Sequence, residues 1–257
     1  MKWIRWVVLC VVLLIVAAGL LFWFMPARVA LPLLSKRMHG MSFEGLSGSV
    51  WQGHADRVVL SDGAVLGTAD WQLGREVVLG RTHLLLHVAG ARGRFDGRYD
   101  QVTADSRAWH DVTFHLDAAA LAGQPLAGDL HPRGTLDGQV SEAVFQGNWP
   151  MTLNGEVSWA DAAIQTPEGH IVLGGLKLQA TSASGFLRGT LADDGSGSLA
   201  TKGDIAASPL GWRADVLLRP RIADTALRHL IARFGPVGPD GSVHIQRKAG
   251  LVPAESP

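Results

Sequence analysis

The stretch Val65–Leu73, VLGTADWQL, alternates between two kinds of residue along its whole length. Apolar residues or glycine stand at every odd position, and the even positions carry Leu66, Thr68, Asp70 and Gln72. A period of two residues is that of a β-strand, because successive side chains of a strand point to opposite faces of the sheet. The stretch therefore predicts a strand with one buried face and one largely polar face.

The same period recurs farther down the chain. It is clearest in Thr82–Val88, Ala108–Leu116 and Met151–Trp159. Further strands are expected at His170–Leu173, Leu176–Ala180, Phe186–Leu191, Ser198–Ile205, Trp212–Leu218 and Ser242–Arg247.

Asx-Gly pairs stand between many of these stretches, and such pairs supply the positive φ angles that tight hairpins require. We expect turns at Ser61–Gly63, Asp96–Gly97, Asp137–Gly138, Asp193–Gly195 and Pro239–Gly241. Asn154–Gly155 falls inside an alternating stretch and therefore predicts a bulge. Since no strand alternates with a helix, the fold class is predicted as mainly β, a curled antiparallel sheet or a sandwich.

One short helix is expected near the C-terminus. Asp224 is a good N-cap, and Gly235 followed by Pro236 ends the helix. The spacing of the apolar residues between them predicts that one face is buried, formed by Leu227, Leu230, Ile231 and Phe234. Arg228 and Arg233 are expected on the exposed side, and the helix is expected to close one end or edge of the sheet.

The beginning of the chain has a different character. Residues 6–25, WVVLCVVLLIVAAGLLFWFM, are all apolar or glycine. A run of about 20 such residues has the length that a helix needs to cross a bilayer. A cleaved signal peptide is the alternative, but the apolar run continues through Leu20–Met25 beyond the small residues Ala17–Gly19. Cys10 lies inside the run, without the small residue before it that a lipoprotein signal requires.

The charges flanking residues 6–25 nearly balance, since Lys2 and Arg5 precede the run and Arg28, Lys36 and Arg37 follow it. A tail of five residues is too short to be a domain, so we place the N-terminus in the cytoplasm and the bulk of the chain outside it. The expected organisation is a cytoplasmic tail at 1–5, a transmembrane helix at 6–25, a juxtamembrane linker at 26–40, a β domain at 41–247 and a disordered tail at 248–257.

Composition excludes several classes of function. The net charge is zero and charged residues make up 18% of the chain, which argues against binding to a nucleic acid. Cys10 is the only cysteine, so no disulfide can form within the chain. We expect no cofactor.

No motif of a known catalytic or metal site is complete. Residues 45–49, GLSGS, begin like a serine-hydrolase elbow but end in Ser49 where glycine is required. His83 and His87 have a spacing that suits metal binding on a helix, whereas a strand separates them by about 13 Å. We therefore expect no catalytic residue and no metal ligand.

Three segments carry a resemblance to a known family. They are GLSGSVWQG at Gly45–Gly53, GTADWQL at Gly67–Leu73, and the closing stretch from Gly211 to Arg247. In this order and at this length, the chain resembles the type II secretion system protein N (general secretion pathway protein N) family.

The resemblance implies a single-pass inner-membrane protein of a Gram-negative bacterium with a periplasmic β domain. It further implies an accessory, non-enzymatic part in the secretion of folded proteins across the outer membrane. The implied partners are other subunits of the secretion system, in the inner-membrane platform or at the secretin, and the inner membrane itself. The family offers no catalytic residues to carry over.

Two interpretations remain for the residues of the first two segments. Glycine in a strand lets a large ring lie close, and an indole buries a large area, so Trp51 and Trp71 could pack together as core. Alternatively these segments form a docking surface for a partner subunit, made of Gly45, Leu46, Gly48, Trp51, Gly53 and Trp71.

Two other functions stay open beside the secretion subunit. A curled sheet with an apolar inner face could bind lipid acyl chains, and HLLLHVA, with apolar residues on both faces, is compatible with such a groove. The other hypothesis is a periplasmic enzyme with an unfamiliar site.

Overall fold

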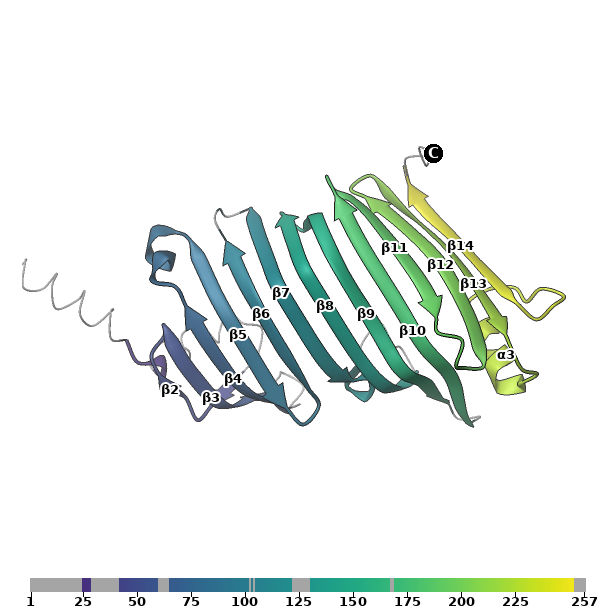
Figure 1. Ribbon diagram of the computed structural model, residues 1–257, viewed down its shortest axis with the longest axis horizontal. Coiled ribbons are helices and arrows are strands. Elements are labelled where there is room, and N and C mark those ends of the chain that lie inside the picture. Colours follow the sequence, from purple (N-terminus) through teal and green to yellow (C-terminus); the bar gives the residue numbers. More distant parts are fainter. Residues whose placement is uncertain are drawn as a thin grey trace, which may run out of the picture.

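The computed structural model describes residues 25–28, 42–59, 65–101, 103, 105–121, 130–166 and 169–251. Within these residues, fourteen strands form one antiparallel sheet in the order β1-β3-β4 and then consecutively to β14, with β2 paired to β3 (Figure 1). The mainly β prediction is confirmed. The sandwich is wrong, because every described strand belongs to the same sheet.

The strands are hairpin-connected over most of the sheet, and two 3-10 turns, η1 (Arg75–Leu79) and η2 (Ala118–Leu121), interrupt the pattern. The strand bounds are β1 (Ser42–Glu44), β2 (Ser47–Gly48), β3 (Gln52–Val59), β4 (Val65–Leu73), β5 (Thr82–Gly90), β6 (Gly93–Gln101), β7 (Ser106–Asp117), β8 (His131–Gln146), β9 (Trp149–Thr166), β10 (Gly169–Ala183), β11 (Phe186–Asp193), β12 (Leu199–Ser208), β13 (Gly211–Pro220) and β14 (Val243–Gly250).

All the predicted strands are present, and β4 has the predicted bounds. The expected strands His170–Leu173 and Leu176–Ala180 are one strand, β10, because Gly174 takes a φ of 95° and absorbs an irregularity without ending the pairing to β9. The sequence places the end of the domain at residue 247, and β14 extends the sheet to Gly250.

Two predicted turns are wrong. Asp96–Gly97 lies inside β6 and Asp137–Gly138 lies inside β8. At Gly138 the reason is packing, since a Cβ there would lie 2.1 Å from Cζ of Phe114 on the neighbouring strand. The glycine is therefore required by a ring that lies across the backbone, which is a second use of glycine in strands.

The other turn signals behave as expected where the structure describes them. Asp193–Gly195 connects β11 to β12, and Pro239–Gly241 precedes β14. A register shift lies beside Asn154–Gly155, but the extra residue is Ser141 of β8. The predicted turn Ser61–Gly63 lies outside the described residues, as do its neighbours at 60 and 64.

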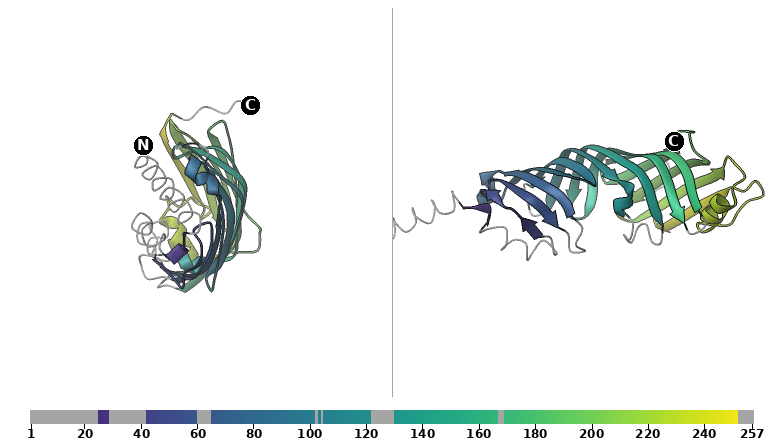
Figure 2. Two further views of the ribbon diagram at one scale, coloured as in Figure 1. Left: turned by 90° about the vertical axis from the view of Figure 1, so that its left-hand side faces the viewer. Right: turned by 90° about the horizontal axis from the view of Figure 1, so that it is seen from below.

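The sheet has one apolar face and one polar face, and the pairing register keeps each face in line. One line of paired residues runs across the sheet from β3 to β14, with one residue from each strand, and all its members are apolar or glycine. They are Ala55, Ala69, Val88, Phe95, Phe114, Gly138, Val157, Leu178, Leu191, Gly203, Val216 and Ile245. We call this set the apolar row. Figure 2 shows the sheet as one curved layer with the helix on its inner side.

The residues immediately beside the apolar row make a second row on the opposite face. They are all polar: His54, Asp70, His87, Asp96, Thr113, Gln139, Glu156, Gln179, Thr190, Asp204, Asp215 and Gln246. We call this set the polar row. Adjacent residues differ in this way because strand side chains alternate between faces.

Two clusters of fully buried residues lie on the apolar face. The smaller one, at the β1–β5 end, contains Leu46, Ala55, Val58 and Ala69. The larger one is built by β9, β10, β12 and β14 together with the helix α3 (Thr225–Ala232). The helix therefore covers the apolar face at the C-terminal end of the sheet, as predicted.

The helix begins as the sequence predicts, since the Asp224 side chain accepts hydrogen bonds from the backbone N–H of Ala226 and Leu227. Leu227, Leu230 and Ile231 are buried, as expected. Phe234 is not on the buried face, because α3 ends at Ala232 and the phenyl ring lies beyond it, 43% exposed.

The predicted transmembrane helix at 6–25 lies outside the described residues except for Met25. Within the described ranges, no helix has both the length and the apolar character needed to cross a bilayer. The anchor therefore stays a prediction from the sequence.

We predict that Leu227→Ala lowers the free energy of unfolding by about 3 kcal/mol, because Leu227 is fully buried between α3 and the sheet and its loss leaves a cavity. Phe234→Ala is the control and is expected to cost less than about 1 kcal/mol, since most surface substitutions do. Chemical denaturation of the full chain in detergent measures both. Equal losses in the two variants would mean that α3 does not cover the core.

Candidate interaction surfaces

The stretch Gly45–Gly53 folds into a small hairpin at the N-terminal end of the sheet. β2 pairs with the start of β3 through Ser47 with His54 and Gly48 with Gly53. The predicted site residue Trp71 stands opposite Gly53 on β4, and its indole lies across the glycine, since a Cβ on Gly53 would be 2.2 Å from Cζ2. The Trp71 Nε1–H donates to the carbonyl of Val50 at 3.0 Å, which fixes the ring over the hairpin.

Gly45, Leu46 and Gly48 shape the same hairpin. Gly45 and Gly48 have φ angles of 66° and 77°, which other residues rarely adopt. Neither has room for a side chain, because a Cβ on Gly45 would lie 2.0 Å from Asp56 Oδ2 and one on Gly48 would lie 2.5 Å from the carbonyl oxygen of Gln52. Leu46 is buried against Ala55, Val58 and Ala69.

The hairpin also holds the first described residues, 25–28, against the sheet. The Val50 N–H donates to the carbonyl of Met25 at 3.1 Å, and Arg28 Nε donates to the carbonyl of Leu46 at 2.7 Å. Trp51 is 7% exposed, and its carbonyl accepts a hydrogen bond from the N–H of Leu73. The six predicted residues are thus brought together, and packing explains each of them. Partner binding by them stays a prediction.

We predict that Gly53→Ala lowers the free energy of unfolding by about 1–3 kcal/mol, because the new methyl group would overlap the Trp71 indole and force it to move. The matched control is Gly189→Ala in β11, where the nearest atom to a new Cβ is 3.5 Å away in Ile205. The control is expected to be neutral or slightly stabilising. Thermal unfolding followed by tryptophan fluorescence compares them, and a neutral Gly53→Ala would contradict the contact.

Histidine–aspartate pairs are the main feature of the polar face between β3 and β8. His54 Nδ1 donates to Asp70 Oδ1 and His115 Nδ1 donates to Asp137 Oδ1, each at 2.7 Å. His83 with Asp100 and His87 with Asp96 form the same cross-strand pair. The charges and hydrogen-bonding groups of this face are therefore largely satisfied within the sheet.

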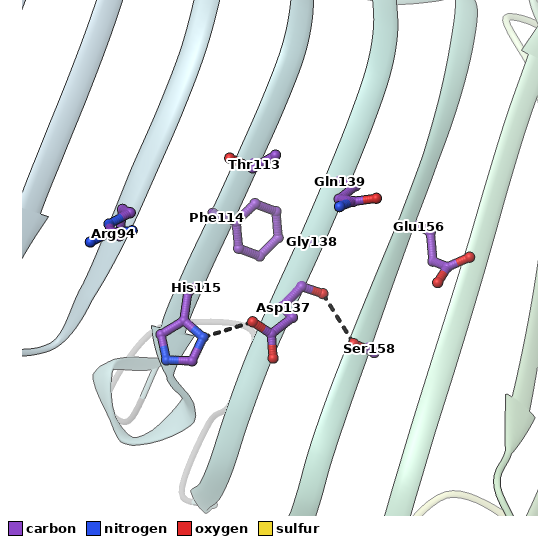
Figure 3. Close-up of a pocket in the computed structure, with 9 residues that line it drawn as sticks. All are labelled: Arg94, Thr113, Phe114, His115, Asp137, Gly138, Gln139, Glu156 and Ser158. Atoms are coloured by element: carbon purple, nitrogen blue, oxygen red, sulfur yellow. Dashed lines mark hydrogen bonds and ion pairs between the residues drawn. The ribbon is translucent and has the colours of Figure 1, made fainter.

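A shallow hollow of about 390 Å³ lies on this face between β6 and β9 (Figure 3). Its lining includes His115, Asp137, Glu156 and Ser158, and the Ser158 hydroxyl is 3.4 Å from the carbonyl oxygen of Asp137. His83 and His87, singled out by their spacing, bind separate aspartates. Among the described residues, no three His, Cys, Asp or Glu side chains are arranged to hold a metal ion.

The environment of His54 raises its pKa above the ordinary value of 6.5, and the hydrogen bond to Asp70 is the largest cause. Asp56, 3.3 Å from Nε2, adds a smaller contribution of the same sign. A raised pKa means that the folded state binds this proton more tightly than the unfolded state. The pair therefore stabilises the fold below about pH 6.5, and that contribution is lost as the pH rises through the raised pKa.

We predict that Asp70→Asn returns the pKa of His54 toward 6.5 and lowers stability more at pH 6 than at pH 9. The control, Asp56→Asn, is expected to change the pKa by less, because Asp70 makes the stronger contribution. NMR titration of the histidine ring protons measures the pKa. A His54 pKa that is unchanged in Asp70→Asn would show that the hydrogen bond to Asp70 does not stabilise the protonated imidazole.

One charged cluster was missed by sequence reasoning, which assigned Asp193 only to a turn. Its carboxylate accepts hydrogen bonds from the N–H of Gly195, the N–H of Thr201 and the guanidinium of Arg221. Burial acts to raise the pKa of Asp193, but the bonds from Arg221, Thr201 and Gly195 together lower it below its usual value. The cluster joins the β11–β12 connection to the segment that follows β13. No local pattern around Asp193 indicates it, because its partner Arg221 is distant in the sequence.

The two edges of the sheet differ. β1 has three residues, while β14 has eight and carries Arg247 and Lys248 near its end. The apolar face is also incompletely covered, since Trp212, on the same face of β13 as Val216, is 43% exposed. These surfaces can offer backbone hydrogen bonds, charge and apolar area to a partner.

The comparisons with known proteins give one result. A family model described as "Type II secretion system (T2SS), protein N" matches residues 39–246, which span the sheet from β1 to the first half of β14. No curated protein and no solved structure matches the chain significantly.

Proposed function

Because the chain belongs to the type II secretion system protein N family, we propose that it is a non-enzymatic, single-pass inner-membrane component of this system whose β domain binds other secretion subunits. The single observation that carries the proposal is the family match over 39–246, since it covers nearly the whole sheet. Membership in a family of secretion components makes the chain part of the secretion apparatus. The anchor, its orientation and the partners are the proposed part.

The proposed topology places residues 1–5 in the cytoplasm, 6–25 in the inner membrane and 41–247 in the periplasm. The apolar run at 6–25 supports the anchor because its length matches the hydrocarbon core. The contacts of Met25 and Arg28 with the Gly45–Gly53 hairpin support a short connection between anchor and sheet. Such a connection would hold the N-terminal end of the sheet close to the membrane surface.

The partner-binding role is proposed for the periplasmic domain as a whole. An extended open sheet offers a large surface for its mass, and on its polar face the charges are mostly paired within the sheet. A partner binding there would meet few uncompensated charges, so that specificity would depend on shape and on the sheet edges. The proposed partners are subunits of the inner-membrane platform or the secretin.

The lipid-binding alternative has no support from the comparisons. The feature on which it would depend is the apolar row, which is only partly covered by α3 and the N-terminal hairpin. Lipid binding therefore stays a prediction from the sequence.

The test uses the full chain, tagged at its C-terminus, in cells that contain the secretion system. We expect it to remain in the membrane after alkaline extraction, to be degraded by protease added to the periplasmic side, and to crosslink to secretion subunits. A variant in which residues 1–25 are replaced by a cleavable signal peptide is the control and should be released in soluble form.

Recovery of the unaltered chain as a trimmed, freely diffusing protein would contradict the anchor. Protection of the β domain from protease until the inner membrane is broken would contradict the topology. Crosslinking that never yields a secretion subunit would contradict the partner-binding role.

A further inference from the structure

The outer side of β14 is an open edge of the described sheet. β14 is the last strand and pairs with β13 from Val243 with Leu218 to Gly250 with Gly211. An open strand edge presents unpaired N–H and C=O groups, which favour the addition of another strand. The opposite edge offers much less, because β1 has three residues and β2 pairs with the same strand as β1.

The direction of the backbone groups in β14 follows from two hydrogen bonds. The Leu251 N–H donates to the Leu210 carbonyl at 2.9 Å, toward β13, while the Ser242 carbonyl accepts from the N–H of Gly238 at 2.8 Å on the other side. Backbone groups alternate in direction along an antiparallel strand, so odd-numbered residues bond β13 and even-numbered residues face outward.

The beginning of the outer side is covered, and the rest is open. Val237 forms an isolated bridge with Val243, which occupies the outer groups near the start of β14. From Gln246 onward, no residue of the described chain bonds the outward N–H and C=O groups. Gln246, Arg247, Lys248, Ala249 and Gly250 are all exposed.

Charge and side-chain pattern indicate what could pair with this edge. Arg247 and Lys248 are adjacent, Arg213 is the register partner of Lys248, and no described carboxylate forms an ion pair with Arg247 or Lys248. Ile245 ends the apolar row, so the next strand would have an apolar face to continue. Strand side chains alternate, so Arg247 follows Ile245 on the apolar face and Lys248 lies on the polar face. These features fit an extended segment with an acidic residue opposite each of the two basic residues.

A second copy of this chain is a poor partner. Antiparallel pairing of two β14 strands over Gln246–Gly250 would bring the basic pairs of the two copies together, and like charges facing each other across strands are destabilising. Pairing between two β14 edges is therefore disfavoured, and an edge with acidic residues is favoured.

We propose that the outer side of β14, from Gln246 to Gly250, binds an extended acidic segment of another secretion subunit, which adds to the sheet as a further strand. This inference rests on the proposed function and names the surface and the chemistry through which the β domain binds its partner. Four outward backbone groups of Gln246 and Lys248 supply the hydrogen bonds. Arg247 and Lys248 supply the charge that selects the partner.

A simpler role for the basic pair is protection of the edge, because charged residues on edge strands discourage aggregation. The two roles respond differently to charge reversal. Glutamate in place of arginine keeps the edge charged and protected, but it repels an acidic segment.

The experiment places a photo-crosslinking residue, benzoyl-phenylalanine, at Ala249 in the full chain, in cells that contain the secretion system. The variants Gln246→Pro, Gln246→Ala and Arg247→Glu are then made in this background. Proline removes the outward N–H of Gln246 without removing a bond to β13, which is the position in which edge strands accept proline. Alanine keeps the N–H and removes only the side chain, which binds Asp215. The same photo-crosslinker at the exposed Thr190, in the middle of the polar face, is the positional control.

We expect Ala249 to crosslink to a peptide of a secretion subunit that contains acidic residues, as identified by mass spectrometry. The yield is expected to fall about tenfold in Gln246→Pro and in Arg247→Glu and to be unchanged in Gln246→Ala. Thermal unfolding of each purified chain checks the fold. If Gln246→Pro lowers the melting temperature, the crosslinking yield of Arg247→Glu alone tests the inference.

Three results would overturn the inference: an undiminished yield in Gln246→Pro and Arg247→Glu, a crosslink from Ala249 to a second copy of the chain, or crosslinks to secretion subunits from Thr190 but none from Ala249. The last result leaves the proposed function standing. If neither position crosslinks to a secretion subunit, the proposed function fails together with the inference.

Discussion

The structure depends on one constraint, the register that keeps the apolar row and the polar row aligned across β3 to β14. A shift of one residue between any two strands would exchange the faces, placing residues such as Glu156 and Asp204 on the apolar side. Twelve consecutive strands therefore have to agree in register, and bulges such as the one at Asp111, with a φ of 51°, restore the alignment where strand lengths differ. The curvature and the position of α3 follow from this arrangement, since only one face requires cover.

The same alignment determines how charge is distributed. Most acidic residues of the polar row stand beside histidine or glutamine on neighbouring strands, whereas Asp204 stands between Thr190 and Asp215. Glu156 has its pKa lowered by hydrogen bonds from Lys177 and Gln179. Asp215 has its pKa lowered in the same way by His244 and Gln246. A surface built of such pairs stays soluble without strong attraction for polyions, which agrees with the zero net charge of the chain.

Sequence reasoning predicted what depends on neighbouring residues and failed where distant residues decide. The period of two located β4 and the other strands, and the helix start at Asp224 was read from its local signal. The turn predicted at Asp137–Gly138 is wrong because the glycine makes room for the ring of Phe114, which lies on another strand. For the candidate site, the sequence suggested that Trp51 and Trp71 could pack on each other, and the structure shows instead that the Trp71 indole lies over Gly53 on the neighbouring strand. It could not predict the cluster around Asp193, because Arg221 is 28 residues away, nor the open side of β14, because edge position is a property of the whole sheet.

The consecutive strand order has a consequence for how the molecule comes into being. From β3 onward, each strand pairs with the one made just before it, so a growing chain meets its template as soon as the next segment has emerged. Contacts of short sequence separation carry a small entropic cost of loop closure, which makes such stepwise accretion fast for a β protein. The process has no closing step among the described strands, because none of the late ones pairs with an early one. The last described strand, β14, therefore keeps its capacity to template another.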